Sequence, residues 1–256
     1  MLTLLINKFK KILFMLIVAS LMAASFTEIM HAQDNKITEM ETIRIDSQYR
    51  QCEVVIRAGE YEGKCGKRIY INNCTVNIPD DIPVRNDGDG KGFYISEWDI
   101  NVKEAKALVE ELRARGINAK LQIAYSKSED LNAAARIANK SNPYLYVSLH
   151  HNYYEADSRG YFSMYNANDA KAKAVADRLS DSISRNGLVP QKQNMPNTGY
   201  IGELNNINPS TTAVLLELGF FSNLEELEII CSDNYVCYVS NRLADEIANI
   251  INSQYK

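Results

Sequence analysis

The sequence predicts an α/β fold in which a parallel or mixed sheet is covered by helices on both faces. Apolar runs of strand length alternate with segments of helical periodicity, which is the order of elements in such folds. In addition, two apolar runs, at 144–149 and 213–216, end abruptly in polar residues. Open α/β sheets place their chemistry at the carboxyl ends of strands, so these two ends are the expected functional edge.

The first part of the fold is expected to contain a strand, a long loop and a long helix. Residues 52–56 (C-E-V-V-I) favour a strand. Residues 59–92 are rich in glycine, asparagine, aspartate and proline, so we expect a loop there, with a short strand at 68–71. A helix is expected over 99–115, because its apolar residues recur at intervals of three and four and a glycine follows it.

The middle of the chain continues the alternation. Residues 119–123 form a short apolar run and are expected to be a strand. The helix expected at 131–140 ends before Pro143, because a proline disfavours helical geometry in the residue before it. Strands are then expected at 144–149 and 161–165.

The last part is expected to contain two helices and the final core strand. Residues 170–185 carry apolar side chains on one helical face, and 239–251 do the same at the C-terminus. Between them we expect a loop at 199–210 and a strand at 213–216.

Length and charge favour one acidic domain. The chain has 256 residues, 46% of them hydrophobic, which suits one full core over residues 52–256. Residues 33–51 are polar and are expected to be a linker. The formal net charge is −4 and no basic stripe is present, so a nucleic-acid partner is not expected.

Residues 1–32 have the order of a secretory signal peptide. Lys8, Lys10 and Lys11 precede an apolar stretch, and Ala32 is the expected cleavage point. The stretch is shorter than the roughly 20 residues of a membrane span. We therefore expect export to the periplasm or the extracellular space, with no stable membrane span after cleavage. An uncleaved N-terminal anchor is the alternative.

The five cysteines allow more than one interpretation. Cys65 with Cys74 and Cys231 with Cys237 are the local pairings expected first in an exported chain, which leaves Cys52 without a partner. The alternative is that all five are small buried apolar residues.

His150 is the first candidate site residue, because the chain has only three histidines and this one ends an apolar strand. Neighbouring residues of a strand point to opposite faces, so His150 and His151 are not expected to reach one metal ion. The alternative is a histidine with a purely structural role in the core or on the surface.

Two glutamates are the other candidates from the residues alone. Glu97 lies just before the long helix, where it could cap the helix or bind zinc. Glu217 stands inside the apolar run V-L-L-E-L-G-F-F, where a carboxylate is costly to bury unless it is paired or functional. Burial would raise its pKa, which suits a general base or acid, and a satisfied structural carboxylate is the alternative.

Several segments together resemble one known family. They are S-E at 96–97 before a helix, L at 131 with A-N at 138–139, S-L-H-H-N at 148–152, Gly160, and V-L-L-E-L-G-F-F-S-N at 214–223. In this order they resemble the zinc-dependent N-acetylmuramoyl-L-alanine amidases of the amidase 3 type, from about Val54 to the C-terminus.

The resemblance implies a single domain with a twisted, mixed and mostly parallel sheet. It implies hydrolysis of the amide between the lactyl group of muramic acid and L-alanine, with peptidoglycan as the partner. One Zn²⁺ ion is implied as cofactor, with Glu97 and His150 as ligands and Glu217 as the catalytic carboxylate.

The chain departs from the family at two positions. The family opens with a strand and a Gly-His-Gly-Gly-like turn whose histidine is the first zinc ligand, and here Glu60 stands at that place. Glu60 is therefore the expected third ligand, with Glu62 as the alternative. The family's arginine in the segment after Leu131 is also displaced, since Ala134 occupies the position and Arg136 lies nearby.

Three functions remain open from the sequence. The leading one is an exported metal-dependent peptidoglycan amidase. The second is a catalytically inactive module of the same fold that binds peptidoglycan or a cell-wall partner, and the third is a metallohydrolase of another amide. The sequence does not predict an oligomeric state.

Overall fold

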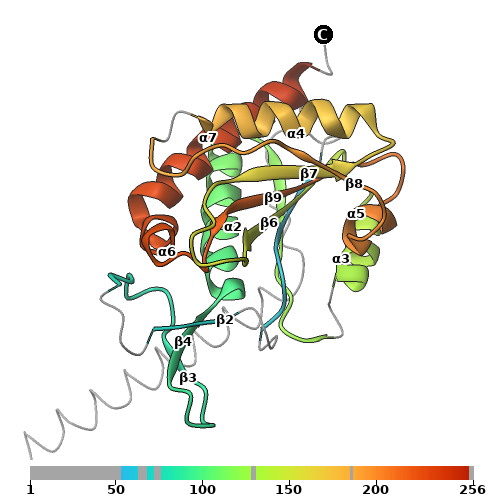
Figure 1. The fold of residues 1–256 in the computed structure, drawn as a ribbon. Helices are drawn as coiled ribbons and strands as arrows, with labels where there is room; N and C mark the ends of the chain where they lie inside the picture. Colours follow the sequence, from blue (N-terminus) through green and yellow to red (C-terminus); the bar gives the residue numbers. More distant parts are fainter. Residues whose placement is uncertain (1–52, 63–67, 72–75, 128–130, 185–186, 254–256) are drawn as a thin grey trace, which may run out of the picture. The chain divides into compact units, whose positions relative to one another are not determined.

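A computed structural model describes residues 53–62, 68–71, 76–127, 131–184 and 187–253 (Figure 1). All of them belong to one unit of the chain, residues 40–256. The predicted signal peptide and linker lie outside the described residues, as do Cys52, Cys65 and Cys74. Within the described part, none of the helices combines the length and the apolar character that crossing a bilayer requires.

The centre of the fold is a six-stranded sheet with the order β5-β1-β6-β9-β7-β8. The first four strands run parallel, β7 runs antiparallel to β9, and β8 runs parallel to β7. The predicted mixed, mostly parallel sheet is thus confirmed. The strands in chain order are β1 (Glu53–Ala58), β5 (Asn118–Gln122), β6 (Leu145–Asn152), β7 (Phe162–Asn166), β8 (Met195–Asn197) and β9 (Thr212–Phe220).

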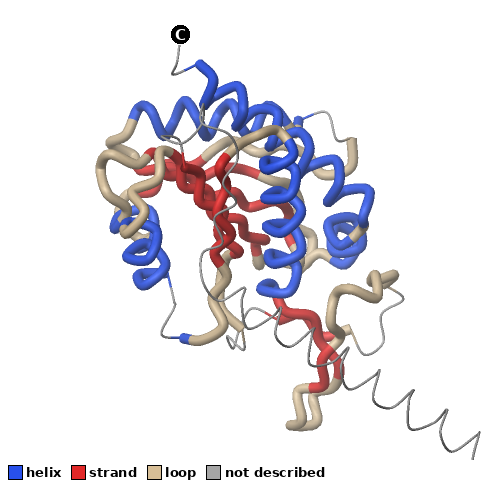
Figure 2. Tube along the Cα trace, turned by 180° about the vertical axis from the view of Figure 1, so that it is seen from behind, coloured by secondary structure: helices blue, strands red, loops and turns tan. Residues whose placement is uncertain are grey.

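Helices cover both faces of this sheet, as predicted (Figures 1 and 2). On one face α2 packs on β1, β5 and β6 and against α7, while α4 packs on β7 and β9. On the other face α3 and α5 pack together. The helices are α2 (Glu97–Ala114), α3 (Leu131–Asn139), α4 (Ala170–Ser182), α5 (Gly202–Asn206), α6 (Leu224–Cys231) and α7 (Asp233–Asn252).

The alternation along β6 decides which side chains face which helices. Tyr146 lies in the core cluster that includes residues of α3 and α5, so Ser148 and His150 share that face. His151 lies on the other face, where it contacts Asn101 of α2. The two adjacent histidines therefore lie on opposite faces of the sheet and have different neighbours.

A second, small sheet precedes α2. Its strands are β2 (Arg68–Tyr70), β3 (Arg85–Asn86) and β4 (Phe93–Ser96), paired antiparallel in the order β2-β4-β3. The short strand predicted at 68–71 is confirmed. β3 and β4 were not predicted, because too few residues separate the turn-forming glycines and aspartates around them to show a period.

The structure also contains elements that periodicity did not predict. The expected loop at 199–210 contains α5, and α6 follows β9 directly. Both are short, so they offer few turns for a pattern. In addition, α7 begins at Asp233 rather than at 239, because the Ser232 hydroxyl accepts a hydrogen bond from the Tyr235 amide and caps the helix there.

The predicted pairing of Cys231 with Cys237 is wrong. Both thiols are free in the structure. Cys231 ends α6 with its side chain buried, whereas Cys237 is exposed on α7. The two side chains thus belong to different environments on separate helices.

Candidate functional site

Three neighbouring strands bring three candidate residues to one edge of the sheet. Glu60 follows the end of β1, His150 lies near the end of β6, and Glu217 lies near the end of β9. His150 and Glu217 are register partners, and Ala58 pairs with Leu149, which places Gly59 beside His150. Parallel partners point to the same face, so the carboxyl edge predicted from the sequence gathers these side chains.

Glu97 reaches this edge from the first turn of α2. Its side chain is fully buried. It does not cap the helix, because Ser96 does so by accepting a hydrogen bond from the Asp99 amide. Instead, Glu97 Oε1 accepts hydrogen bonds from Asn101 Nδ2 at 3.2 Å and from the backbone amide of His151 at 3.3 Å.

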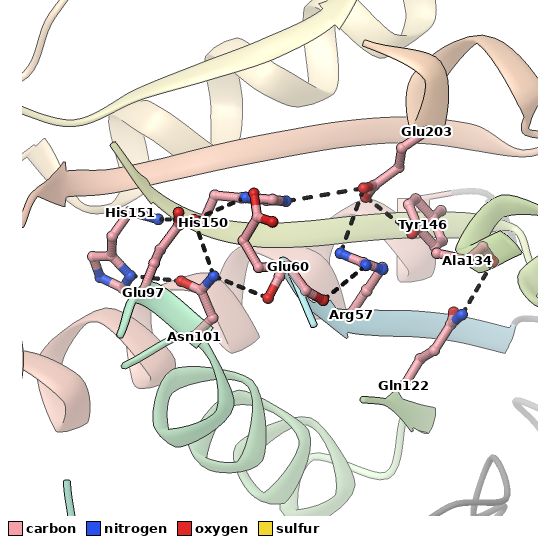
Figure 3. A network of polar contacts seen from close by, with 11 residues as sticks. Arg57, Glu60, Glu97, Asn101, Gln122, Ala134, Tyr146, His150, His151 and Glu203 are labelled. Carbon is pink, nitrogen blue, oxygen red and sulfur yellow. Dashed lines mark hydrogen bonds and ion pairs between the residues drawn. The ribbon is translucent and has the colours of Figure 1, made fainter. Parts of the chain in front are cut away.

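His150 lies between two carboxylates (Figure 3). Its Nδ1 is 3.0 Å from Glu97 Oε1, and its Nε2 is 3.9 Å from Glu203 Oε2. Burial lowers the pKa of the imidazole, but the carboxylates around it, Glu203 and Glu97 foremost, raise it to about 10. The site therefore attracts positive charge.

Gly59 makes room for the His150 ring. A Cβ at this position would lie 2.4 Å from Nε2 and 2.5 Å from Cδ2 and Cε1 of the imidazole. No side chain fits at that distance, so the absence of one at Gly59 is what lets the ring lie against the backbone of the β1 end.

The side chain of His151 takes no part in this cluster. Its Nδ1 lies 2.8 Å from Asn101 Oδ1. Burial lowers the pKa of His151 to about 3, so the ring is neutral at physiological pH. Asn101 uses its Nδ2 to donate to Gly59 O and to Glu97, which leaves its Oδ1 as the acceptor for the His151 ring.

Glu60, Glu97 and His150 form a group with the donors of a metal site. Each offers one ligand atom, the three atoms lie within 4.8 Å of one another, and all three residues are buried. Two carboxylate oxygens and one imidazole nitrogen are a donor set that binds divalent cations. The residues present therefore fit the ion that the family resemblance implies.

Glu60 holds its position through an unusual backbone. Its φ is +65°, in the left-handed region that residues with a side chain rarely occupy, and the residue is only 4% exposed. The Arg57 guanidinium donates to the Glu60 carbonyl at 3.1 Å, which fixes the turn. Strained residues of this kind gather at functional sites, and here the strain turns a carboxylate inward.

Sequence reasoning missed the carboxylate on the far side of His150. Glu203 of α5 is fully buried, accepts a hydrogen bond from the Tyr146 hydroxyl at 3.0 Å, and lies 3.5 Å from Arg57 Nη1. Burial raises its pKa, but Arg57 and His150 outweigh burial and lower it to about 2. The polar segment around Glu203 gave no signal, whereas a charge at Arg57 inside an apolar strand was a usable one.

The displaced arginine of the family has no substitute nearby in sequence. Ala134 is fully buried and its carbonyl accepts a hydrogen bond from Gln122 Nε2, while Arg136 is exposed. The buried cation of this site is Arg57, which comes from β1 instead (Figure 3).

Glu217 is less buried than its apolar neighbours suggest. It is partly exposed, whereas Leu216 and Leu218 on either side are fully buried. It shares the face of the sheet with His150, and its charge contributes to the raised pKa of that imidazole. The side chain thus lies on the face of the sheet that carries His150 and keeps partial contact with solvent.

Comparison with known families identifies the family to which the chain belongs. Residues 85–253, more than half of it, match the Amidase_3 family, described as N-acetylmuramoyl-L-alanine amidase. The chain is a member of this amidase family. The matched region includes Glu97, His150 and Glu217, and it begins after Glu60. A search for relatives of curated function finds no match.

Solved amidase structures share the fold. An N-acetylmuramoyl-L-alanine amidase from Clostridium difficile 630 aligns with a TM-score of 0.60 at 19% identity, covering 79% of this chain and 98% of that one. Ami1 from Mycobacterium smegmatis aligns with a TM-score of 0.61 at 18% identity, covering 81% and 100%. The CwlD amidase from Clostridioides difficile, solved in complex with the GerS lipoprotein, aligns at 0.57 and 19%, covering 79% and 99%.

Proposed function

We propose that this amidase is an exported, metal-dependent hydrolase of the N-acetylmuramoyl-L-alanine bond in peptidoglycan. The observation that carries the proposal is the convergence of three buried ligand residues, Glu60, Glu97 and His150, beside Glu217 at one edge of the sheet. Membership of the amidase family supports the bond type and the cell-wall substrate.

The proposed mechanism divides the work between two sets of side chains. Glu97, His150 and Glu60 would hold a divalent ion, which when bound would supply a Lewis acid for the amide hydrolysis. Glu217 accepts the proton of that water and passes it to the leaving amine. Its partial exposure lets water and a polymeric substrate reach it.

The carboxylate at Glu60 changes the character of the metal site. A second anionic ligand would offset more of the ion's charge than a histidine would, and the ion would then be a weaker Lewis acid. Carboxylate oxygens also favour harder ions than imidazole nitrogens do. We propose zinc as the cofactor because it is the ion that the family uses. The second carboxylate should make the site more tolerant of harder ions such as manganese than a site with a second histidine is.

An inactive binding module is the second candidate. It is favoured by Glu60, which stands in place of the family's first ligand histidine and precedes the matched region. Such a module would bind peptidoglycan saturably without releasing stem peptide, and Glu217→Ala would leave binding intact.

One experiment separates the two candidates. Zinc content and cleavage of muramoyl-alanine bonds are measured for the chain from Gln33 onward and for its Glu60→His variant. About one zinc per chain with cleavage by the wild type supports the proposed amidase. Zinc and cleavage in the variant alone identify the natural chain as an inactive module. Absence of both zinc and cleavage in both proteins contradicts the site assignment.

Export is part of the proposal and has its own test. The predicted signal peptide at 1–32 supports it. N-terminal sequencing of protein recovered from outside the cytoplasm of an expressing host is expected to start at Gln33. Recovery only in the membrane fraction with an intact N-terminus would favour the uncleaved anchor.

A further inference from the structure

We propose that Glu203 is a positioning residue whose negative charge favours the proton of His150 on Nε2 and thereby commits Nδ1 of the same ring to the metal ion. The inference rests on the proposed metal site and deepens it. It concerns a residue of α5, outside the ligand group itself.

The two ring nitrogens of His150 face different partners. Nδ1 lies 3.0 Å from Glu97 Oε1, so it faces the ligand group, whereas Nε2 lies 3.9 Å from Glu203 Oε2. A neutral imidazole has one N–H and one lone pair. A carboxylate beside Nε2 favours the proton there and leaves the lone pair of Nδ1 for the ion. Metal-binding histidines generally donate their other N–H to such an acceptor.

Glu203 is held firmly enough to act in this way. It is fully buried, the Tyr146 hydroxyl donates to its Oε1 at 3.0 Å, and Arg57 Nη1 lies 3.5 Å from its Oε2. Arg57 also donates to the Glu60 carbonyl. A single buried guanidinium therefore ties the acceptor of His150 to the turn that carries the third ligand (Figure 3).

Two observations argue against other roles for Glu203. The group whose ligand atoms lie within 4.8 Å of one another contains Glu60, Glu97 and His150, and Glu203 is not among them. It is thus an outer partner of the histidine rather than a ligand. The backbone of Gly59 lies against the imidazole and restricts its movement. The ring therefore stays between Glu97 and Glu203, and a proton held on Nε2 leaves the lone pair on Nδ1.

The test uses exported wild-type protein and its Glu203→Gln and Glu203→Ala variants. Zinc affinity is measured by chelator competition, and the Co²⁺-loaded forms are compared by visible absorption. We expect Glu203→Gln to lower zinc affinity by 10- to 100-fold and to shift the Co²⁺ spectrum, because outer partners of ligating histidines have effects of this size. Glu203→Ala should lose more, since glutamine still offers an acceptor oxygen.

Two further measurements separate positioning from folding. Tyr146→Phe keeps Glu203 but removes one of its donors, and should weaken zinc binding by about fivefold, the effect of one ordinary hydrogen bond. The ¹⁵N spectrum of histidine in the zinc-loaded wild type should show the His150 proton on Nε2. As a control, Glu104→Gln alters a different buried carboxyl, on α2, and should leave zinc affinity unchanged.

The outcomes distinguish this inference from the proposed function. Wild-type zinc affinity and Co²⁺ spectrum in folded Glu203→Gln, or a His150 proton on Nδ1, would overturn the role of Glu203 and leave the metal site standing. A wild type that binds neither ion would overturn the metal site and the role of Glu203 together.

Discussion

At the residue scale, the end of β1 shows how two adjacent positions build one site. Gly59 has no side chain, so the imidazole of His150 lies against its backbone. Glu60 follows with a left-handed backbone that turns its carboxylate toward the same imidazole. Neither role depends on hydrophobic pattern, which is why periodicity alone does not reveal them.

Gly59→Ala should disrupt the metal site more than the fold. The added methyl would lie 2.4 Å from His150 Nε2 and would displace the ring. We expect zinc affinity to fall by at least tenfold, with a stability loss of about 1–3 kcal/mol from overpacking. Chelator competition and urea unfolding measure the two effects. Gly88→Ala, where the new methyl meets open space but φ is +73°, should lower stability without changing zinc affinity.

Glu217→Gln should strongly reduce catalysis while leaving metal content unchanged. The amide keeps the size of the side chain and removes the base, so we expect kcat to fall by about 10²- to 10⁴-fold. Zinc analysis and muropeptide release measure both properties. Glu246→Gln, a partly buried carboxylate that pairs with Arg178 on the helical face, is the matched control and should retain activity. Equal activity in both variants would remove Glu217 from the mechanism.

The sequence reveals some of the residues around His150 and not others. The sequence singled out His150 and Glu97 as candidates because each stands at a boundary between an apolar segment and a polar one, and the structure brings their side chains to 3.0 Å. Glu203 and Asn101 were not found, because a polar residue in a polar segment or on a helix has no distinguishing context. Their partners come from distant segments, and only the fold supplies that proximity.

At the element scale, the start of α2 supports both the helix and the site. Ser96 Oγ accepts from the Asp99 amide at 3.3 Å and donates to the Asp99 carboxylate at 2.6 Å. Arg85 of β3 pairs with the same carboxylate at 2.7 Å. Glu97 is the first residue of this capped turn, so the cap determines how firmly the carboxylate is held.

Ser96→Ala should therefore affect both stability and metal binding. Loss of the cap should cost about 1 kcal/mol of unfolding free energy and weaken zinc binding through fraying of the turn that carries Glu97. Asp169→Ala removes the cap of α4, where the Asp169 carboxylate accepts from the Ala172 amide at 2.9 Å. This control should cost a similar free energy and leave zinc affinity unchanged, as urea unfolding and chelator competition will show.

The long, strongly periodic elements were predictable, and the short ones were not. The helix expected at 99–115 is α2, and the C-terminal helix expected at 239–251 is most of α7. β6 and β9 extend beyond their expected ends, to Asn152 and Phe220, because ladder pairing continues past the polar residue that follows each apolar run. α5 spans only Gly202–Asn206, and its packing rather than its propensity holds it in place.

At the scale of the whole molecule, a buried carboxyl links stability to pH. Glu104 of α2 is 1% exposed, and burial, opposed only by the charge of Lys103, raises its pKa from 4.5 to about 8. The unfolded chain therefore releases this proton near pH 4.5, whereas the folded protein keeps it up to about pH 8. Between these values the unfolded state binds fewer protons, so stability falls as pH rises.

Glu104→Gln should remove this pH dependence. The wild type should lose on the order of 5 kcal/mol between about pH 4.5 and pH 8 from this one group, at 1.36 kcal/mol for each pH unit, with no further loss above pH 8. The variant should show a smaller decline over the same range. Urea midpoints at pH 5 and pH 8 measure the difference. Glu110→Gln, exposed on the same helix, should behave as the wild type does.

The order of the strands was beyond sequence reasoning. Alternating strands and helices predict a mostly parallel sheet, and the functional edge follows from where the apolar runs end. The position of β9 between β6 and β7, however, depends on how the strands pack together in the whole fold. This placement makes His150 and Glu217 register partners, and no local pattern encodes it.

β9 is the last strand in the chain, and this affects when the sheet can be completed during synthesis. β6 and β7 precede it in the chain, yet each pairs with it rather than with the other. Until residues 212–220 have been made, neither β6 nor β7 can form its pairing with β9, so the central sheet cannot be completed. Because Glu217 lies on β9, the edge that carries the candidate site is complete only after most of the chain has been made.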